Sequence, residues 1–196
     1  MVLILRDAER VAVAWKNGGG LTREIAVHPA GSDLGSFDWR VSIAQVRAAG
    51  AFSCFPGVLR QMAVLEGAVS LSIGGGVPVY LSADTPPVSF AGDVPTYAQP
   101  SRAPVTDLNV MTRRGRCSAR LTRRTASTPV QLRLEAATTL IVALSPLILC
   151  ADGTHWDLSR LDAARVEGAL QCEVAALEAG PGARFYLAEI CATGGA

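Results

Sequence analysis

A run of three glycines among polar residues is the part of the sequence best suited to chemistry. Gly18, Gly19 and Gly20 follow a Lys-Asn pair and precede the strand-like segment 22–25. Consecutive glycines let the backbone turn sharply or approach another group closely, at an entropic cost. The polar side chains gathered around them are Asn17, Thr22, Arg23 and Glu24. This combination indicates a lined site rather than a plain connection between strands.

The glycine run does not fit the common phosphate-binding motifs. A P-loop carries its Lys and its Ser or Thr after the glycines, at the start of a helix, whereas Lys16 precedes them here. No helical pattern begins at Gly20, so the dinucleotide-binding fingerprint is absent as well.

Two arginines are candidates for binding a carboxylate. Arg60 follows an apolar segment, and Arg40 alternates with Trp39 and Val41, so it points away from the face that those two share. A guanidinium inside an apolar barrel needs an anionic partner, and its planar fork suits bidentate capture of a carboxylate. The partner is either Glu24, paired with Arg60 or Arg40, or a bound anionic ligand.

Short strands are the elements that must position these residues. Apolar or alternating runs bounded by Gly and Pro recur along the chain, without long helical segments between them. The expected strands are residues 11–14, 21–27, 39–46, 61–73, 78–81, 88–91, 108–112, 130–135, 138–144, 147–151, 164–167, 171–177 and 183–190, with single helical turns at 32–36 and 154–161. The pattern predicts an all-β fold.

The strands fall into two halves, an N-terminal half of residues 1–115 and a C-terminal half of residues 116–196. Each half has a strand–Glu-Gly–strand element, at Glu66-Gly67 and at Glu167-Gly168. We expect each glycine to form a short turn at the corner of a barrel. The predicted architecture is a bicupin, two jelly-roll/cupin β-barrels packed into one compact unit, with exchange of strands between the halves allowed.

The residues of a cupin metal centre are missing. In metal-binding cupins a His-x-His pair precedes a Glu, which a Gly follows; aligned on Gly67, Arg60 falls at the Glu position. The two His positions are taken by Cys54 and Pro56 or, with the longer spacing, by Ser53 and Phe55. Neither pair can hold a divalent metal. We therefore expect no metal and no other cofactor.

Composition indicates a compact protein of the cytoplasm. Hydrophobic residues make up 49% of the chain, and the net charge of +1 gives no reason to expect nucleic acid or a membrane as partner. The five cysteines include no CxxC pair, and no basic residue precedes the apolar N-terminus, which together favour a reducing compartment.

Six arginines and no acid lie between Arg113 and Arg124; a solvated connection is the simplest interpretation, and an anion-binding patch or a protein-interaction face is the alternative. Edge strands make a homodimer a reasonable expectation.

Several blocks of the sequence, in order, resemble the HutD/Ves family. They are residues 15–25, 37–44, 50–53, 55–60, 65–67, 90–93 and 107–114. The resemblance implies a bicupin without the usual metal centre. It also implies an association with bacterial histidine utilisation, in which members look like modulators and not pathway enzymes, although others are stress-induced proteins. Leu59 departs from the pattern, which has an acidic or polar residue there; this would alter ligand choice if the position contacts ligand.

The leading interpretation is a small-molecule-binding modulator of histidine utilisation. The ligand would be a small carboxylate, such as urocanate, formiminoglutamate or formylglutamate, held by Arg60 and Arg40. Hydrogen bonds would come from Asn17, Thr22, Glu24 and Ser42, and apolar walls from Trp15, Trp39 and Phe55. Core packing is the simpler role for these aromatic residues, and the preferred one for Trp39.

The alternative is a metal-independent enzyme that acts on such an intermediate. Glu24 would serve as general acid or base, and an arginine would hold the substrate. Cys54 is a weaker candidate nucleophile, because no histidine is evident beside it. The sequence leans toward binding without turnover and leaves catalysis open.

Overall fold

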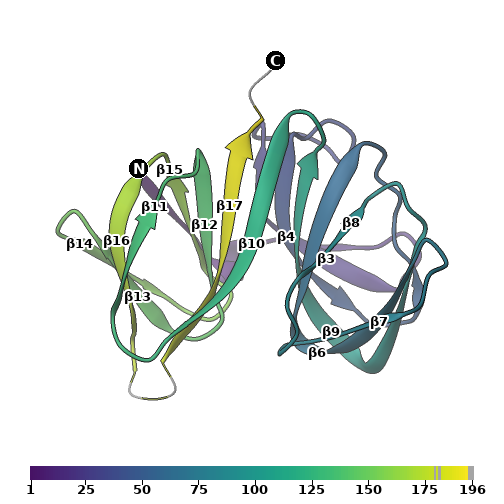
Figure 1. Cartoon of the computed structure of the whole chain (residues 1–196). Coiled ribbons are helices and arrows are strands. Elements are labelled where there is room, and N and C mark those ends of the chain that lie inside the picture. The colour runs from purple at the N-terminus through teal and green to yellow at the C-terminus, as the bar shows by residue number, and fades with distance from the viewer. Residues whose placement is uncertain (179, 181, 194–196) are drawn as a thin grey trace. The chain divides into compact units, whose positions relative to one another are not determined.

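The described part of the protein consists almost entirely of β-strands and the loops between them (Figure 1). The computed structural model describes residues 1–178, 180 and 182–193, and within them the only helix is a 3-10 turn, Asp7–Glu9. The all-β prediction is therefore confirmed. The described residues include no helix of the length and apolarity needed to cross a membrane. The strands group into two compact units: residues 10–118 with Thr193, called here the pocket unit, and residues 1–9 with 119–192, called the second unit.

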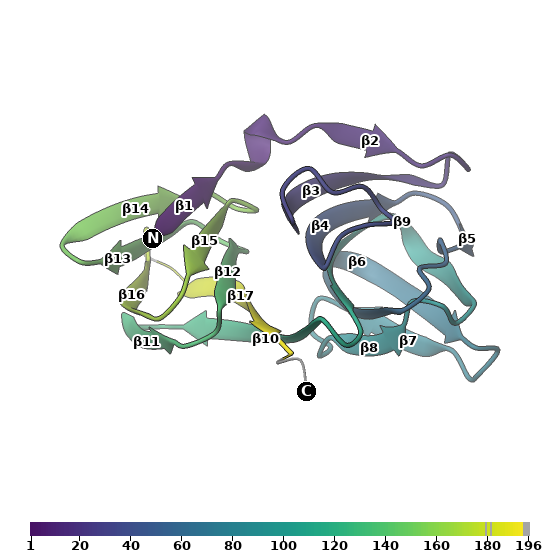
Figure 2. The same ribbon diagram turned by 90° about the horizontal axis from the view of Figure 1, so that it is seen from above.

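The pocket unit contains an eight-stranded antiparallel sheet in the order β2-β3-β4-β9-β6-β7, with β5 paired to β9 and β8 paired to β6. The strands are β2 (Ala12–Ala14), β3 (Gly20–His28), β4 (Trp39–Val46), β5 (Gly50–Ala51), β6 (Val58–Ile73), β7 (Val79–Ser82), β8 (Val88–Ala91) and β9 (Thr96–Arg113). Figure 2 shows β2, β3 and β4 side by side, in agreement with their pairing.

Alternation along β6 decides which of its side chains are buried. Val58, Arg60, Met62 and Val64 lie on one face, because successive side chains of a strand point to opposite sides. All four are at most 6% exposed. Met62 and Val64 belong to the main apolar cluster of the unit. Arg60 is thus a charged group on the core-facing side of the strand, where it requires polar partners.

The two Glu-Gly elements adopt different structures. Gly67 lies inside β6, where the pairing with β9 shifts in register, and it has a φ of +83°. A Cβ at this position would lie 3.3 Å from the carbonyl oxygen of Pro104, so the backbone of β9 approaches closely. The turn predicted there is wrong; it is a bulge within a long strand. Gly168, with a φ of +74°, does connect two strands, as predicted.

The second unit contains two antiparallel sheets, in the orders β1-β15-β12-β17-β10 and β11-β16-β13-β14. The strands are β1 (Val2–Leu5), β10 (Cys117–Ala126), β11 (Val130–Leu134), β12 (Thr138–Ala143), β13 (Leu147–Ala151), β14 (Thr154–Leu158), β15 (Ala163–Glu167), β16 (Leu170–Ala176) and β17 (Ala183–Ala192). Both sheets contribute to one apolar cluster, which includes Ile141, Leu149 and Phe185. Residues 1–9 belong to this unit because β1 pairs with β15.

Neither of the predicted helical turns forms. Residues 154–158 are strand β14, which pairs with β13 across the two-residue loop Asp152-Gly153. Both loop residues have positive φ, 49° and 72°, and an Asp-Gly pair of this kind favours a tight hairpin over a helix. Segment 32–36 is a turn in which the Asp33 carboxylate accepts hydrogen bonds from Gly35 and Ser36. This local bonding competes with helix formation.

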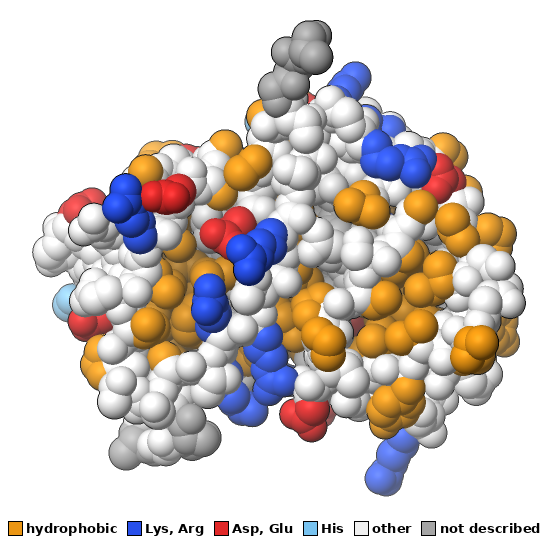
Figure 3. Space-filling view, viewed as in Figure 1, with side chains coloured by type: hydrophobic (Ala, Val, Ile, Leu, Met, Phe, Trp, Pro, Cys, Tyr) orange, Lys and Arg blue, Asp and Glu red, His pale blue; other side chains and the backbone are white. Residues whose placement is uncertain are grey.

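The arginine-rich segment divides between the two units. In the pocket unit, Arg113 donates to the carbonyl oxygens of Phe37 and Gly35, Arg114 pairs with Asp93, and Arg116 pairs with Asp38. The rest of the segment lies on β10, at the edge of its sheet, and Figure 3 shows basic side chains over this strand. Charged side chains on an edge strand oppose pairing with another chain.

Candidate functional site

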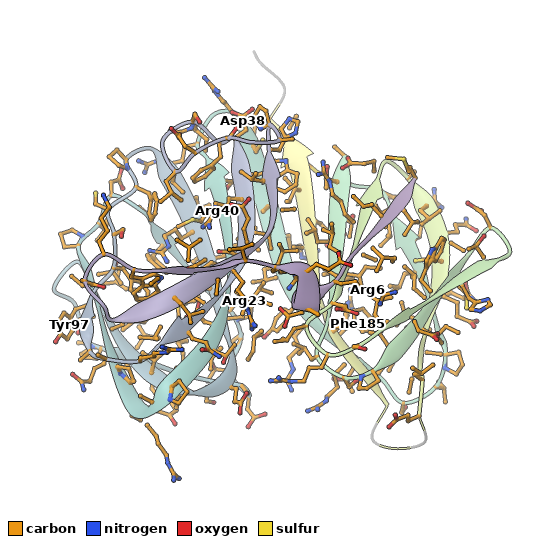
Figure 4. The ribbon with its side chains drawn as sticks, turned by 180° about the vertical axis from the view of Figure 1, so that it is seen from behind. Arg6, Arg23, Asp38, Arg40, Tyr97 and Phe185 are labelled. Carbon is orange, nitrogen blue, oxygen red and sulfur yellow. The ribbon has the colours of Figure 1, made fainter. Side chains whose placement is uncertain are left out.

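An open cavity of about 680 Å³ lies within the pocket unit. The polar lining residues that strands contribute alternate along neighbouring strands and therefore face the same side of the sheet. These are Thr22 and Glu24 on β3, Arg40 and Ser42 on β4, Arg60 on β6, and Asp107 and Asn109 on β9. Arg40 can be found in Figure 4. The volume of the cavity falls in the range of about 300–1,000 Å³ that is typical of small-molecule sites.

The structure brings the sequence-predicted site residues together. Asn17, Thr22, Glu24, Arg40, Ser42, Phe55 and Arg60 all line this one cavity, and so does Trp15. Trp39 does not line it: the side chain is 3% exposed and its ring stacks on His28, with 5.8 Å between ring centroids. The preferred role of Trp39, packing in the core, agrees with this position.

The glycine run shapes one wall of the cavity. Gly18, with a φ of +69°, allows the chain to reverse, so that its N–H bonds the carbonyl of Trp15 at 3.0 Å. At Gly20 a Cβ would lie 2.3 Å from the carbonyl oxygen of Gln45 and 3.1 Å from the Trp15 ring. Only glycine allows the backbone and the indole to approach this closely.

Trp15 is thereby held as part of that wall. Its indole N–H donates to the Thr22 hydroxyl at 2.8 Å, and its ring meets Phe52 edge-on, with 6.2 Å between centroids. In this arrangement the role of the glycines is structural, because they let the Trp15 side chain pack against β3. They do not form an anion-binding loop followed by a helix.

Glu24 pairs with Arg40, one of the two partners that the sequence left open. Arg40 Nε lies 2.7 Å from Glu24 Oε2, and Arg40 Nη1 donates to the Ser42 hydroxyl at 3.4 Å. The Glu24 side chain is 41% exposed and that of Arg40 13%. Glu24 is therefore fixed in orientation yet accessible from the cavity.

Arg60 has partners that the sequence did not suggest. Its Nη2 donates to Asn109 Oδ1 at 2.8 Å, and Asn109 in turn donates to Asp107. The guanidinium carbon lies 4.9 Å from the ring centroid of Phe52, 5.0 Å from that of Phe90 and 5.8 Å from that of Phe55. Aromatic faces stabilise such a cation. Burial lowers the pKa of Arg60 to about 10, so the group remains charged at neutral pH.

Asp107 is, together with Asn109, a site residue on β9 that sequence reasoning missed. It is 1% exposed, its Oδ1 accepts the hydrogen bond from Asn109, and its Oδ2 has no partner among the described residues. Burial raises the pKa of Asp107 to about 7, against the opposing attraction of Arg60. The signal was present: Asp107 and Asn109 alternate with Leu108 and Val110, which places two polar groups on one face of a buried strand.

The chemistry available in the cavity is that of arginines, carboxyl groups and hydroxyls. The described residues contain no group of three or more His, Cys, Asp or Glu side chains that could hold a metal ion. Cys54 is exposed and, unlike its neighbours Ser53 and Phe55, does not line the cavity. The structure therefore gives this cysteine no place in the site.

Sequence comparisons relate the chain to bacterial proteins. The HutD family model matches residues 7–181. Protein Ves of Citrobacter koseri is 41% identical over 108 residues, which are 55% of this chain and 56% of that protein. Protein Ves of Cronobacter sakazakii is 38% identical over 59% of this chain and 63% of that protein. An uncharacterised protein from the hutC 3′ region of Pseudomonas putida is 44% identical over 33% of each chain. All three matches cover less than two thirds of the relative's length.

Solved structures match over nearly the whole chain. A conserved protein of unknown function from Pseudomonas aeruginosa has a TM-score of 0.88 and 28% identity, over 97% of this chain and 99% of that one. HutD from Pseudomonas fluorescens, in a formate condition, has a TM-score of 0.83 and 28% identity, over 99% and 100% of the two chains. Oxalate decarboxylase from Bacillus subtilis shares the fold alone, with a TM-score of 0.67 at 8% identity over 97% of this chain and 79% of that one. Because the family model spans most of the sequence, the chain belongs to the HutD/Ves family.

Proposed function

We propose that the protein binds a small carboxylate in the cavity of the pocket unit and thereby modulates histidine utilisation. Arg60 is the observation that carries the proposal. It is a charged guanidinium on the cavity lining whose Nη2 donates to Asn109. Its Nε is buried and has no hydrogen-bond partner among the described residues, so a carboxylate that displaced the side chains covering it would supply a missing acceptor. An Nε–H and an adjacent Nη–H form the fork that suits a carboxylate.

The surrounding groups support a ligand with a carboxylate head and a small body that can both accept hydrogen bonds and contact aromatic rings. The Nδ2 of Asn17 is available to donate, since its Oδ1 accepts from the Gly19 N–H, and the Thr22 hydroxyl that accepts from Trp15 can itself donate. Phe52, Phe55 and Trp15 offer apolar surface. Urocanate, formiminoglutamate and formylglutamate are the candidates, with Arg60 as the main anchor because Arg40 is already paired.

The comparisons support the connection to histidine utilisation. The family is HutD, and one relative is named for the hutC region of Pseudomonas putida. We further propose that the two units are the two barrels of a bicupin, and that the protein works in the reducing cytoplasm, which suits its free cysteines.

A thermal-shift panel tests the proposal. Urocanate, formiminoglutamate, formylglutamate, glutamate and formate would each be added to the wild type, to Arg60→Gln and to Arg47→Gln, a variant of an exposed arginine in the same unit. A ligand at 100 times its Kd adds about 2.7 kcal/mol to the free energy of unfolding. We expect one carboxylate to raise the midpoint of the wild type and of Arg47→Gln, and not that of Arg60→Gln. No shift with any of these carboxylates would contradict the proposal.

The enzymatic alternative has one observation in its favour, the accessible carboxylate of Glu24 in the cavity. A general acid or base must reach the substrate within hydrogen-bond distance. Incubation of each candidate with the purified protein, followed by chromatography, separates the two functions. Loss of a compound, abolished in Glu24→Gln, would replace binding by catalysis as the function of the site.

A further inference from the structure

The charged side chains that β3, β4, β6 and β9 contribute to the cavity already balance one another. Glu24 faces Arg40 at 2.7 Å. Asp107 is coupled to Arg60 both electrostatically and through Asn109, which bridges the two groups by hydrogen bonds. The site with all four groups ionised is therefore neutral before any ligand enters.

The environment of Asp107 offers little else to stabilise a further negative charge. Its cross-strand neighbours are Ala44 on β4 and Val64 on β6, both apolar and buried. The other charged residues that line the cavity, Lys16 and Asp33, lie in exposed loop segments. A carboxylate bound at Arg60 would leave one uncompensated negative charge in a desolvated place, which is unfavourable.

A proton on Asp107 removes that excess charge. Its Oδ2 is buried and has no hydrogen-bond partner among the described residues, so ionisation of this oxygen is not supported by a donor. Burial already raises the pKa of Asp107 to about 7, and a second anion beside Arg60 would raise the pKa further through like-charge repulsion.

We propose that Asp107 takes up a proton when a carboxylate binds at Arg60, so that ligand affinity is coupled to protonation of this residue. The inference rests on the proposed function, because it requires a carboxylate in the cavity. The step is balanced simply: one proton moves from solvent to Asp107, the ligand stays ionised on Arg60, and no ligand bond breaks. Asp107 is then a ligand-recognition residue that sets the charge the site accepts.

The coupling fixes the sign of the pH dependence. Below about pH 6 Asp107 is mostly protonated in the free protein, and binding needs no extra proton. Above pH 7 it is mostly ionised, and each further pH unit lowers the affinity up to tenfold. We expect the affinity for a carboxylate to be about tenfold weaker at pH 8 than at pH 6.

Calorimetry with formate and with acetate, two monocarboxylates that stay ionised between pH 6 and 8 and so bring one negative charge each, tests this coupling. Titrations in two buffers of different ionisation enthalpy count the protons bound, and we expect the count to approach one per ligand at pH 8. Asp107→Asn, which mimics the neutral carboxyl group, is expected to bind at pH 8 at least as tightly as the wild type does at pH 6, without pH dependence. The control Asp152→Asn, an exposed position in the second unit, keeps the wild-type profile.

The outcomes separate this inference from the function on which it rests. Three results overturn the coupling and leave carboxylate binding intact. They are binding of either probe without proton uptake, affinity that rises with pH, and binding by Asp107→Asn at pH 8 that is weaker than binding by the wild type at pH 6. Failure of both probes to bind at any pH removes the proposed function and the coupling together. The pH dependence of the wild-type affinity and the number of protons bound test the coupling even if Asp107→Asn does not fold.

Discussion

Asp107 makes the stability of the ligand-free protein depend on pH in an unusual direction. Its pKa is about 7 in the folded chain, against an ordinary value of 3.8, so the folded state holds a proton that the unfolded state has released. The resulting stabilisation is complete below pH 3.8 and is lost as pH rises through 7. We predict that the free energy of unfolding falls by about 1 kcal/mol between pH 6 and pH 8 through this group.

Urea unfolding at the two pH values measures this fall. In Asp107→Asn the change between pH 6 and pH 8 is expected to shrink by the same amount. A fall of equal size in the variant and in the wild type would show that another group titrates.

The individual residues of the site were easier to predict than their partners. Residue type and alternation named Arg40, Arg60 and Glu24 as one group, and all three line the cavity. Which arginine pairs with Glu24 depends on the register of β3 against β4, where Glu24 lies opposite Ser42 and so within reach of Arg40. The register of β3 against β4 cannot be derived from the sequence directly. The role of Asp107 depends in the same way on β9 lying between β4 and β6.

At the scale of elements, the glycine run depends on Gly20 more than on its neighbour. A methyl group at Gly20 would collide with the backbone oxygen of Gln45, whereas one at Gly19 would meet only the Asn17 side chain, at 3.3 Å. We predict that Gly20→Ala lowers the free energy of unfolding by about 1–3 kcal/mol. It should also weaken the ligand response, because Trp15 and β3 must move apart.

The matched variant Gly19→Ala is expected to change stability by no more than about 0.5 kcal/mol. Urea unfolding of both variants, followed by tryptophan fluorescence, makes the comparison. Equal losses in the two variants would mean that chain flexibility, and not close approach, explains the glycines.

Strands were predictable where an apolar pattern was strong and were missed where charge or a turn signal decided the outcome. The buried run at 138–143 was expected from its composition, whereas β10 was not, because it is an edge strand with three arginines and few apolar residues. The strand β14 follows an Asp-Gly loop whose hairpin preference outweighed a weak helical pattern. The bulge at Gly67 is set by the backbone of β9, far away in sequence.

At the scale of the molecule, Asp162 links residues 1–9 to the rest of the second unit. Its carboxylate accepts from Arg6 at 2.8 Å, from the backbone N–H of Asp7 at 2.8 Å and from that of Ser159 at 3.1 Å. Figure 4 shows Arg6 beside the 3-10 turn. Burial acts to raise the pKa of Asp162, but these hydrogen bonds bring it below its ordinary value. We predict that Asp162→Asn lowers the free energy of unfolding by about 1–3 kcal/mol at pH 7.

Hydrogen exchange locates the effect of this variant. Amides of β1 and β15 are expected to exchange faster in Asp162→Asn, while those of the pocket unit keep their protection. Asp157→Asn serves as the control, because Arg6 bonds the backbone carbonyl of Asp157 and not its side chain. Faster exchange throughout the chain would argue against a local tie.

The position of β1 could not be predicted from sequence. Val2–Leu5 is a short apolar run, and nothing in it specifies a partner more than 150 residues away rather than the strands that follow. Pairing over such a separation is decided by which sheet edge is free once the rest of the unit has formed.

That pairing has a consequence for how the protein is made. A ribosome releases β1 before the unbroken stretch 10–118 that builds the cavity, and it releases the strand β15 that β1 pairs with only after that stretch. During translation β1 therefore stays without its partner strand while the cavity-forming residues 10–118 can already fold. In the nascent chain the cavity can therefore form before β1 pairs with β15.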